Sequence, residues 1–235
     1  MDKRNVLPKC ELKARKKFLI DLCVGKKVMH IGCTGGLLDE KSIEKYSKDF
    51  DLSKDTHSKL AAVASEISGI DISEEKIEVM KRCGVPGSLS ARDITDTTKV
   101  ISDKYEVIVF ANIIEHLDNV GAALKNCRDM MDEGSLLVIT TNNAFCIRTF
   151  IKMFFNYESV HIEHTAYYSY LTLKRVLEMN GLKIKDFYFS KNERTKFGNI
   201  VDRMTYYVGN FVSTLFHQFS QDLIAVVEKD KQLET

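Results

Sequence analysis

The alternation of apolar runs with amphipathic stretches constrains the fold of this chain more than any other feature. The apolar runs are rich in Val, Ile and Leu, and most lack the polar alternation of a half-exposed strand. Strands that are apolar on both faces form a parallel sheet covered by helices on both sides, which predicts an α/β fold. The strands are expected in residues 26–32, 65–73, 87–94, 105–112, 135–143, 182–190 and 221–230.

Helix signals lie between these strands. Ser73 is suited to cap the N-terminus of the first helix after the second strand, and Gly84 is suited to end it. Gly134 and Gly181 are expected to end two later helices in the same way. The helices are expected in residues 10–23, 73–84, 119–134 and 169–181.

Length and composition predict one soluble domain over residues 1–235, with an N-terminal helical segment in residues 1–25. The formal net charge is +1, which argues against large nucleic acid partners. The six cysteines form no C-x-x-C pair, and no His/Cys group has zinc spacing, so no metal site is expected. Scattered cysteines and the absence of a signal-like N-terminus predict a cytoplasmic location.

Two segments interrupt the alternation. Residues 37–60 are polar and follow a glycine turn, and they are interpreted either as a surface insertion or as a lid over a ligand. Residues 195–220 place apolar side chains at helical spacing before the last strand. This helix is expected to pack on its own domain or on a second copy in a homodimer; the alternatives are a wall of an acceptor pocket and shallow membrane attachment.

The membrane interpretation draws on four further residues. Phe154 and Phe155 would enter the lipid surface, and Arg148 and Lys152 would face its headgroups.

The first strand runs into a glycine turn, VMHIGCTGG, over residues 28–36. Such a turn brings backbone N–H groups close to a ligand. Asp71 and Asp93 end the next two strands, and strand ends of a parallel sheet meet at one edge. A ribose diol and an adenine amine could bind these two carboxylates, so the sequence predicts a nucleoside site. The spacing Gly32-x-Thr34-x-Gly36 does not match the G-x-G-x-x-G loop of a dinucleotide site.

The ordered set of motifs resembles class I S-adenosylmethionine-dependent methyltransferases, in particular the ubiquinone- and menaquinone-biosynthesis type. The motifs are HIGCTGG, ISGIDISEEKIEVMKRCG, ARDI, YEVIVFANIIEHLDN and HIEHTAYYSYLTLKRVLEMNGLKI, and the resemblance covers roughly residues 25–190. It implies a Rossmann-like fold with a seven-stranded, mostly parallel sheet whose last strand is antiparallel. It also implies S-adenosyl-L-methionine as cofactor and S-adenosyl-L-homocysteine as product.

The resemblance further implies which residues contact the cofactor. Two of them depart from the family pattern, since His30 stands where the family has an acid and Thr34 where it has a second glycine. Asp71 matches the ribose acid, and Asp93 with Ile94 would flank adenine. The full set is His30, Gly32, Cys33, Thr34, Gly36, Asp71, Ile72, Asp93, Ile94 and Asn112.

Two histidine-bearing segments supply candidate catalytic groups. His164 or His116 is expected to act as a general base for an acceptor hydroxyl, with Glu115 as its orienting group. Each of these histidines could instead serve a structural role. His161 and His57 are expected at the surface, with a place for His57 in the lid as the alternative.

A related motif gives a second reason to expect no metal. Some RNA 3′-end methyltransferases bind a divalent metal through E-x-x-E-H and a later histidine. Here Asn112 replaces the first glutamate, so one carboxylate of that set is missing.

The function expected from these features is in-line methyl transfer to a hydroxyl of a small molecule or saccharide. One alternative is a non-catalytic binding protein with the same fold, which His30 and Thr34 motivate. The other is a nicotinamide-dependent oxidoreductase, which the loop spacing disfavours.

Overall fold

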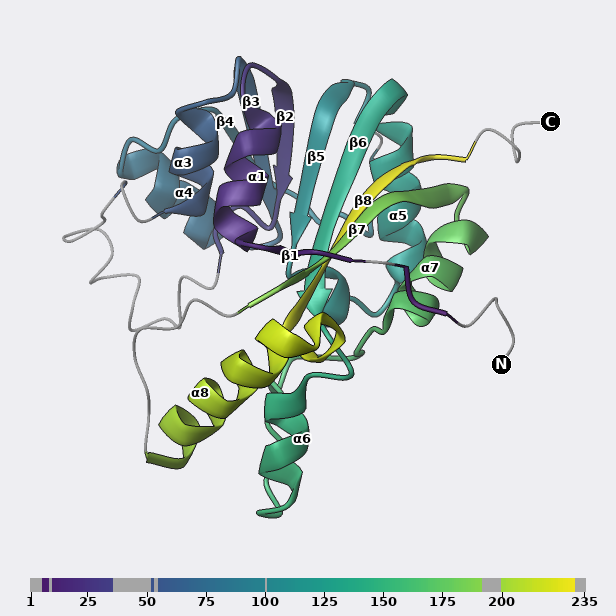
Figure 1. Ribbon diagram of the computed structural model, residues 1–235. Coiled ribbons are helices and arrows are strands. Elements are labelled where there is room, and N and C mark those ends of the chain that lie inside the picture. The colour runs from purple at the N-terminus through teal and green to yellow at the C-terminus, as the bar shows by residue number, and fades with distance from the viewer. Residues whose placement is uncertain are drawn as a thin grey trace.

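The protein is an α/β sandwich in which helices cover both faces of one twisted sheet, as seen in this computed structural model (Figure 1). The structure describes residues 6–8, 10–35, 52, 55–99, 101–191 and 200–230. The strands are β1 (Leu12–Lys13), β2 (Lys27–Ile31), β3 (Glu66–Asp71), β4 (Ser88–Ala91), β5 (Tyr105–Ala111), β6 (Met131–Asn142), β7 (Leu182–Ser190) and β8 (Asp222–Lys229). The α-helices are α1 (Arg15–Cys23), α3 (Thr56–Ala61), α4 (Glu74–Arg82), α5 (Val120–Asp129), α6 (Ile147–Met153), α7 (Tyr170–Met179) and α8 (Ile200–Leu215), and η2 (Ile114–His116) and η3 (His217–Phe219) are 3₁₀ turns.

The strand order is β1-β7-β8-β6-β5-β2-β3-β4. Neighbouring strands from β6 to β4 are parallel, whereas β8 runs antiparallel to both β6 and β7. This confirms the expected mostly parallel sheet with an antiparallel last strand. The sheet has one strand more than expected because β1 pairs with β7 through Leu12 and Lys13 and covers its open edge.

Three hydrophobic clusters hold helices on the sheet, and the smallest packs α4 on β4. One joins α5 and α7 to the strands through residues such as Leu124, Phe110 and Leu177. Another joins α1 and α3 to the opposite face through Leu19, Leu60 and neighbouring strand residues. The central strands are therefore buried on both sides, as their continuous apolar sequence predicts.

Most predicted boundaries agree with the structure. Ser73 caps α4 by accepting a hydrogen bond from the Lys76 backbone N–H, and Gly84 and Gly181 follow their helices with positive φ. The helix expected to run to Gly134 instead ends at Asp129, because Met131 already pairs with Tyr105 in the sheet. Gly134 lies within β6, next to a register shift, with φ of 87°.

The N-terminal helix is also shorter than expected. It begins at Arg15 rather than at residue 10, since the chain just before it is drawn into β1. The proposed lid, residues 37–60, lies mostly outside the described residues; its last part forms α3, which Asp55 caps.

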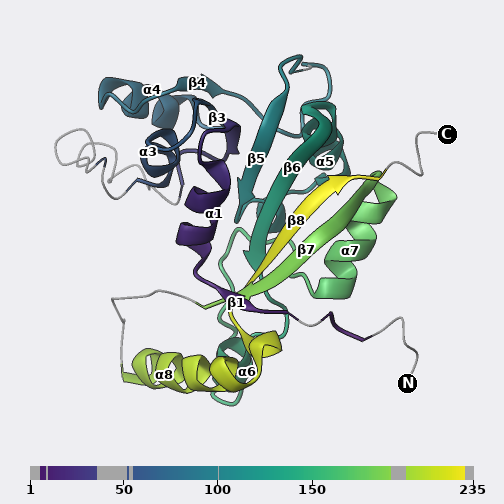
Figure 2. The ribbon, with the colours of Figure 1, turned by 45° about the horizontal axis from the view of Figure 1, so that its top comes forward.

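Helices α6 and α8 lie beyond the carboxyl ends of the parallel strands, where β2, β5 and β6 point (Figures 1 and 2). Here α8 packs against α6 through small residues: Thr205, Gly209 and Ser213 are buried. Its apolar face points outward, so the expected packing on its own domain is wrong, and the expected packing on a second copy stays a prediction. Ile200, Met204, Tyr207, Val208, Phe211 and Leu215 are exposed. Among the described residues, no helix is long and apolar enough to cross a membrane.

Candidate cofactor and acceptor site

The glycine turn after β2 is built so that no side chain fits at its first glycine. Gly32 has φ of 71°, and its N–H donates to the Ile70 carbonyl at 2.8 Å. A Cβ at this position would overlap the Ile113 side chain. Glycine is therefore required both by the backbone conformation and by the close approach of Ile113. Gly36, the last glycine of the predicted loop, lies outside the described residues.

Asp71 ends β3 beside this turn, as expected. Its Oδ2 accepts from the Thr34 hydroxyl at 2.6 Å and from the Thr34 N–H at 3.3 Å, and its Oδ1 accepts from the Ser73 N–H at 3.1 Å. A carboxylate has about four acceptor positions, so three are filled within the protein. A ribose diol would find one position open, and a second would open if the Thr34 hydroxyl rotated away. The half-buried Asp71 carboxylate thus fits a ribose, and the Thr34 hydroxyl would compete with the ribose hydroxyls for Asp71 Oδ2.

The other predicted cofactor residues of this half of the sheet differ in their surroundings. Ile72 is 74% exposed, so its side chain is free to pack on a planar ligand. Asp93 accepts from the N–H and hydroxyl of Thr95, both at 2.8 Å, and stays half-buried. Ile94 belongs to the hydrophobic core, and Cys33 is buried beneath α4, so only the backbone of these two residues can face a ligand.

Asn112 is locked in place at the end of β5 by groups that the sequence did not suggest. It has φ of 56°, and its Oδ1 accepts from Arg15 at 2.8 Å and from Thr140 at 2.6 Å. Arg15 also pairs with the buried Asp222 at 3.2 Å. An arginine at a helix start gave no signal in the sequence, because its partners lie 97 and 207 residues away.

Among the described residues, the side-chain partner of His30 is His57 rather than the turn backbone. The two Nδ1 atoms are 3.2 Å apart, the rings stack, and His57 Nε2 lies 3.0 Å from the Pro86 carbonyl. Since a carbonyl only accepts, His57 donates from Nε2, and its Nδ1 accepts from His30. Burial, with a smaller contribution from His57, lowers the pKa of His30 to about 3. The expectation of a surface position for His57 is wrong, since its side chain is fully buried.

Glu115 faces the core rather than His116. Its Oε2 accepts from the Thr141 hydroxyl at 2.9 Å, and its Oε1 is buried without a hydrogen-bond partner among the described residues. Burial raises the pKa of Glu115 to about 7. The carboxylate next to His116 belongs instead to Glu163, whose Oε2 lies 3.9 Å from His116 Nδ1. The expected orienting role of Glu115 therefore has no contact to support it.

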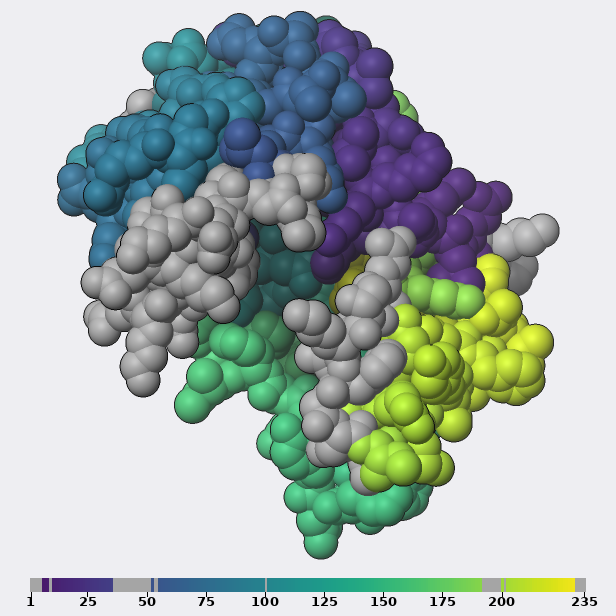
Figure 3. All heavy atoms as spheres, turned by 90° about the vertical axis from the view of Figure 1, so that its left-hand side faces the viewer, coloured from purple at the N-terminus to yellow at the C-terminus, as the bar shows by residue number. Residues whose placement is uncertain are grey.

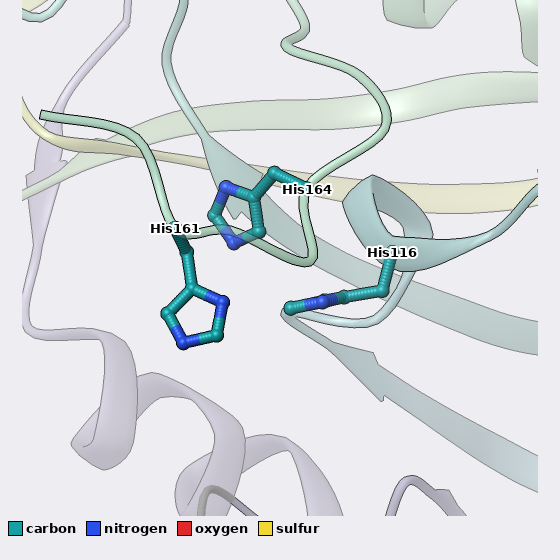
Figure 4. A group of neighbouring side chains, drawn as sticks. All are labelled: His116, His161 and His164. Atoms are coloured by element: carbon teal, nitrogen blue, oxygen red, sulfur yellow. The ribbon is translucent and has the colours of Figure 1, made fainter. Parts of the chain in front are cut away.

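His116, His161 and His164 converge at this edge of the sheet (Figure 4). His116 ends η2, and the other two come from the loop between α6 and α7. One nitrogen of each ring lies within 4.8 Å of the others. Burial lowers the pKa of His116 and of His164, so both are neutral near pH 7 and can accept a proton. His161 is exposed, as expected.

The surface around these strand ends is hollowed. Figure 3 shows the hollow between the blue elements of the N-terminal half and the green segment that carries α6. Arg148 and Lys152 do not face outward here, because both pair with Asp202 of α8, at 3.0 and 3.2 Å, and all three side chains are largely buried. The membrane interpretation placed Arg148 and Lys152 at lipid headgroups, but both side chains form ion pairs within the protein.

Comparison with known proteins agrees with this geometry. A family model described as a methyltransferase domain matches residues 8–186. The ubiquinone biosynthesis O-methyltransferase of Shewanella halifaxensis is 22% identical over 132 residues, which are 54% of this chain and 48% of that protein. The chain thus spans about half the length of the curated relatives it matches.

Solved structures show the same fold. Magnesium protoporphyrin IX methyltransferase from Synechocystis, with bound S-adenosylhomocysteine, aligns with a TM-score of 0.57 at 10% identity over 91% of this chain and 82% of its own. A methyltransferase from Archaeoglobus fulgidus aligns with a TM-score of 0.54 at 20% identity over 92% and 91% of the two chains. The family match, the strand order and the glycine turn beside Asp71 together show that this chain belongs to the methyltransferase domain family, with the fold of class I S-adenosylmethionine-dependent methyltransferases.

Proposed function

We propose that this protein transfers a methyl group from S-adenosylmethionine to a hydroxyl oxygen of a small molecule or saccharide. The observation that carries the proposal is the pairing of the Gly32 turn with the Asp71 carboxylate at the carboxyl edge of the sheet. The relatives of similar sequence are named O-methyltransferases, which supports oxygen as the accepting atom.

The cofactor, when bound, supplies a methyl group on a positively charged sulfur. The protein then has to place the acceptor oxygen in line with that methyl group and remove its proton. Asp71 would hold the ribose, and exposed Ile72 would cover one side of the adenine. His164 or His116 would accept the hydroxyl proton, because both are neutral and lie together beyond the end of β5.

Calorimetric titration with S-adenosylhomocysteine tests the cofactor site. We expect binding, and we expect Asp71→Asn to weaken it at least about tenfold, the effect of losing a hydrogen bond to a charged group. Asp129→Asn, at the C-terminal end of α5, changes a half-buried aspartate away from the glycine turn; it is the matched control and should bind normally. No binding at millimolar ligand would contradict the enzyme assignment and favour a non-catalytic protein of this fold.

Turnover is followed as S-adenosylhomocysteine released in the presence of a panel of phenols and saccharides. His164→Ala or His116→Ala should lower turnover by about 10²-fold, the low end for a general base, with cofactor affinity unchanged. Wild-type rates in both variants would mean that neither histidine is a general base and that alignment of the acceptor with the methyl group is sufficient for the reaction.

A further inference from the structure

The three convergent histidines come from two separate segments of the chain. The cluster consists of His116, His161 and His164, and 45 residues separate the first of them from the second. Ring centroids are 4.6 Å apart for His116 and His164, 5.4 Å for His161 and His164, and 5.8 Å for His116 and His161. Each ring contacts both of the others, so the three imidazoles surround a common space rather than forming a row (Figure 4).

The backbone around the cluster holds the two segments together. The Thr165 N–H donates to the Glu115 carbonyl at 2.8 Å, and the Thr165 hydroxyl donates to the carbonyls of Glu115 and Leu117 at 3.1 and 3.0 Å. His164 is thereby fixed beside His116. The His164 N–H donates to the His161 carbonyl at 3.0 Å, which closes the turn that brings His161 to the same side.

One ring nitrogen of the cluster is buried with its hydrogen-bonding capacity unsatisfied among the described residues. His164 Nδ1 is buried and has no hydrogen-bond partner among the described residues. A buried ring nitrogen without a partner is costly unless a water molecule or an ion supplies one. The carboxylate of Glu163 lies near the cluster, 3.9 Å from His116 Nδ1 and 3.8 Å from His161 Nδ1. Its negative charge would offset part of the charge of a bound cation.

We propose that this cluster is a binding site for a divalent transition metal ion, with zinc as the ion it suits best. Imidazole nitrogen is a preferred ligand of zinc, and three protein ligands with a free fourth position are the arrangement of catalytic zinc sites. Zn–N bonds of about 2.0–2.1 Å place the nitrogens of a tetrahedral site about 3.3 Å apart. The three nitrogens lie within 4.8 Å, so small side-chain rotations, chiefly of exposed His161, would complete the site.

Metal binding at this cluster does not depend on the proposed function, but its consequence for catalysis does. An acceptor hydroxyl bound at the fourth position would lose its proton more easily, because the metal stabilises the oxyanion. A histidine that ligates the metal cannot accept that proton, so in the metal-bound protein the proton would pass to solvent water, and the ion would make its release easier instead of a histidine removing it.

The test is titration of the untagged protein with Co²⁺, followed by displacement with Zn²⁺ in a calorimeter, without cofactor or acceptor. We expect one equivalent to bind with the visible absorption of four-coordinate Co²⁺. His161→Ala should weaken binding at least about tenfold, because even second-shell partners of a metal cost 10–100-fold. His161 is exposed, so the variant should fold, and unchanged thermal unfolding checks this. His217→Ala, outside the cluster, is the matched control.

Three results would overturn the metal site: no stoichiometric binding, equal affinity in wild type and His161→Ala, or sulfur-to-cobalt charge-transfer bands that place the ion on cysteines. Because the titration contains no S-adenosylmethionine, its failure leaves the proposed function intact. Conversely, a protein that fails to bind S-adenosylhomocysteine can still bind the metal, so the two failures are distinguishable.

Discussion

The buried pair His30–His57 predicts a specific loss of stability in mild acid. The pKa of His30 is lowered to about 3 in the folded protein, from an ordinary value of 6.5. At pH 5 the unfolded chain therefore carries a proton on His30 that the folded protein does not. Stability contributed by a group of this kind is present above pH 6.5 and is lost as the pH falls toward 3.

The magnitude follows from the two pKa values. Between pH 7 and pH 5, protonation of the unfolded state at His30 lowers the free energy of unfolding by about 2 kcal/mol. Because pH 5 lies well above the pKa of His30 in the folded protein, the size of this loss depends on the pKa of His30 in the unfolded chain. His57 acts in the same direction, since burial lowers its pKa as well.

Two buried acids act in the opposite direction. The pKa of Glu115 is raised to about 7 and that of Asp222 to about 6, so at pH 5 the folded protein holds protons that the unfolded chain, with ordinary values of 4.5 and 3.8, has already released. Stability from these groups is present at low pH and is lost as the pH rises through the raised values. The stability of the wild type alone cannot isolate His30, and the comparison must be made between variants.

The assay is urea unfolding of wild type and His30→Gln at pH 7 and pH 5. Glutamine keeps an N–H that can donate to His57 but does not titrate. We expect the wild type to lose about 2 kcal/mol more than His30→Gln between the two pH values. His161→Gln, an exposed histidine, should follow the wild type. Equal losses in wild type and His30→Gln would refute the assignment of a neutral, buried imidazole pair.

Three further predictions test the rest of the architecture. Gly32→Ala should cost about 1–3 kcal/mol in urea unfolding and weaken S-adenosylhomocysteine binding, and Ile113→Ala should restore part of both; a neutral Gly32→Ala would contradict the close packing of the turn. Asp202→Asn leaves two buried cations unpaired and should cost about 3–5 kcal/mol, and a loss within 0.5 kcal/mol would show that the ion pairs are solvated. The exposed stripe of α8 should be covered by a second copy in solution, so sedimentation should show a dimer that Phe211→Glu converts to monomer; a wild-type monomer would refute it.

Local sequence patterns were sufficient to predict the strands β2 to β8 and the cofactor half of the site, which is the glycine turn and Asp71. Apolar runs marked the strands because a buried parallel strand needs apolar residues on both faces. Asp71 could be placed from the sequence because it ends a strand, and the carboxyl ends of parallel strands meet at one edge. The glycine turn could be recognised because its glycines directly follow an apolar strand.

The spacing of apolar residues was insufficient to predict which face of a helix packs on the rest of the protein. The apolar stripe of α8 was expected to pack on the domain or on a second copy, yet the face that packs on α6 is the opposite one, where Thr205, Gly209 and Ser213 are small enough for a close approach. Glu115 was expected to orient the catalytic histidine, His164 or His116. In a 3₁₀ turn adjacent side chains point in different directions, and Glu115 turned toward Thr141.

The sequence by itself determined the strands β2 to β8, the helices α1, α4, α5, α7 and α8, the glycine turn and the acid at the end of β3, because each depends on residues close together in the chain. Only the tertiary structure decided that His30 pairs with His57, that Arg15 holds Asn112, and that three histidines meet at one point. These contacts join segments 27 to 97 residues apart, and their geometry depends on how helices and loops pack on the finished sheet. Residue type alone carries no information about that packing.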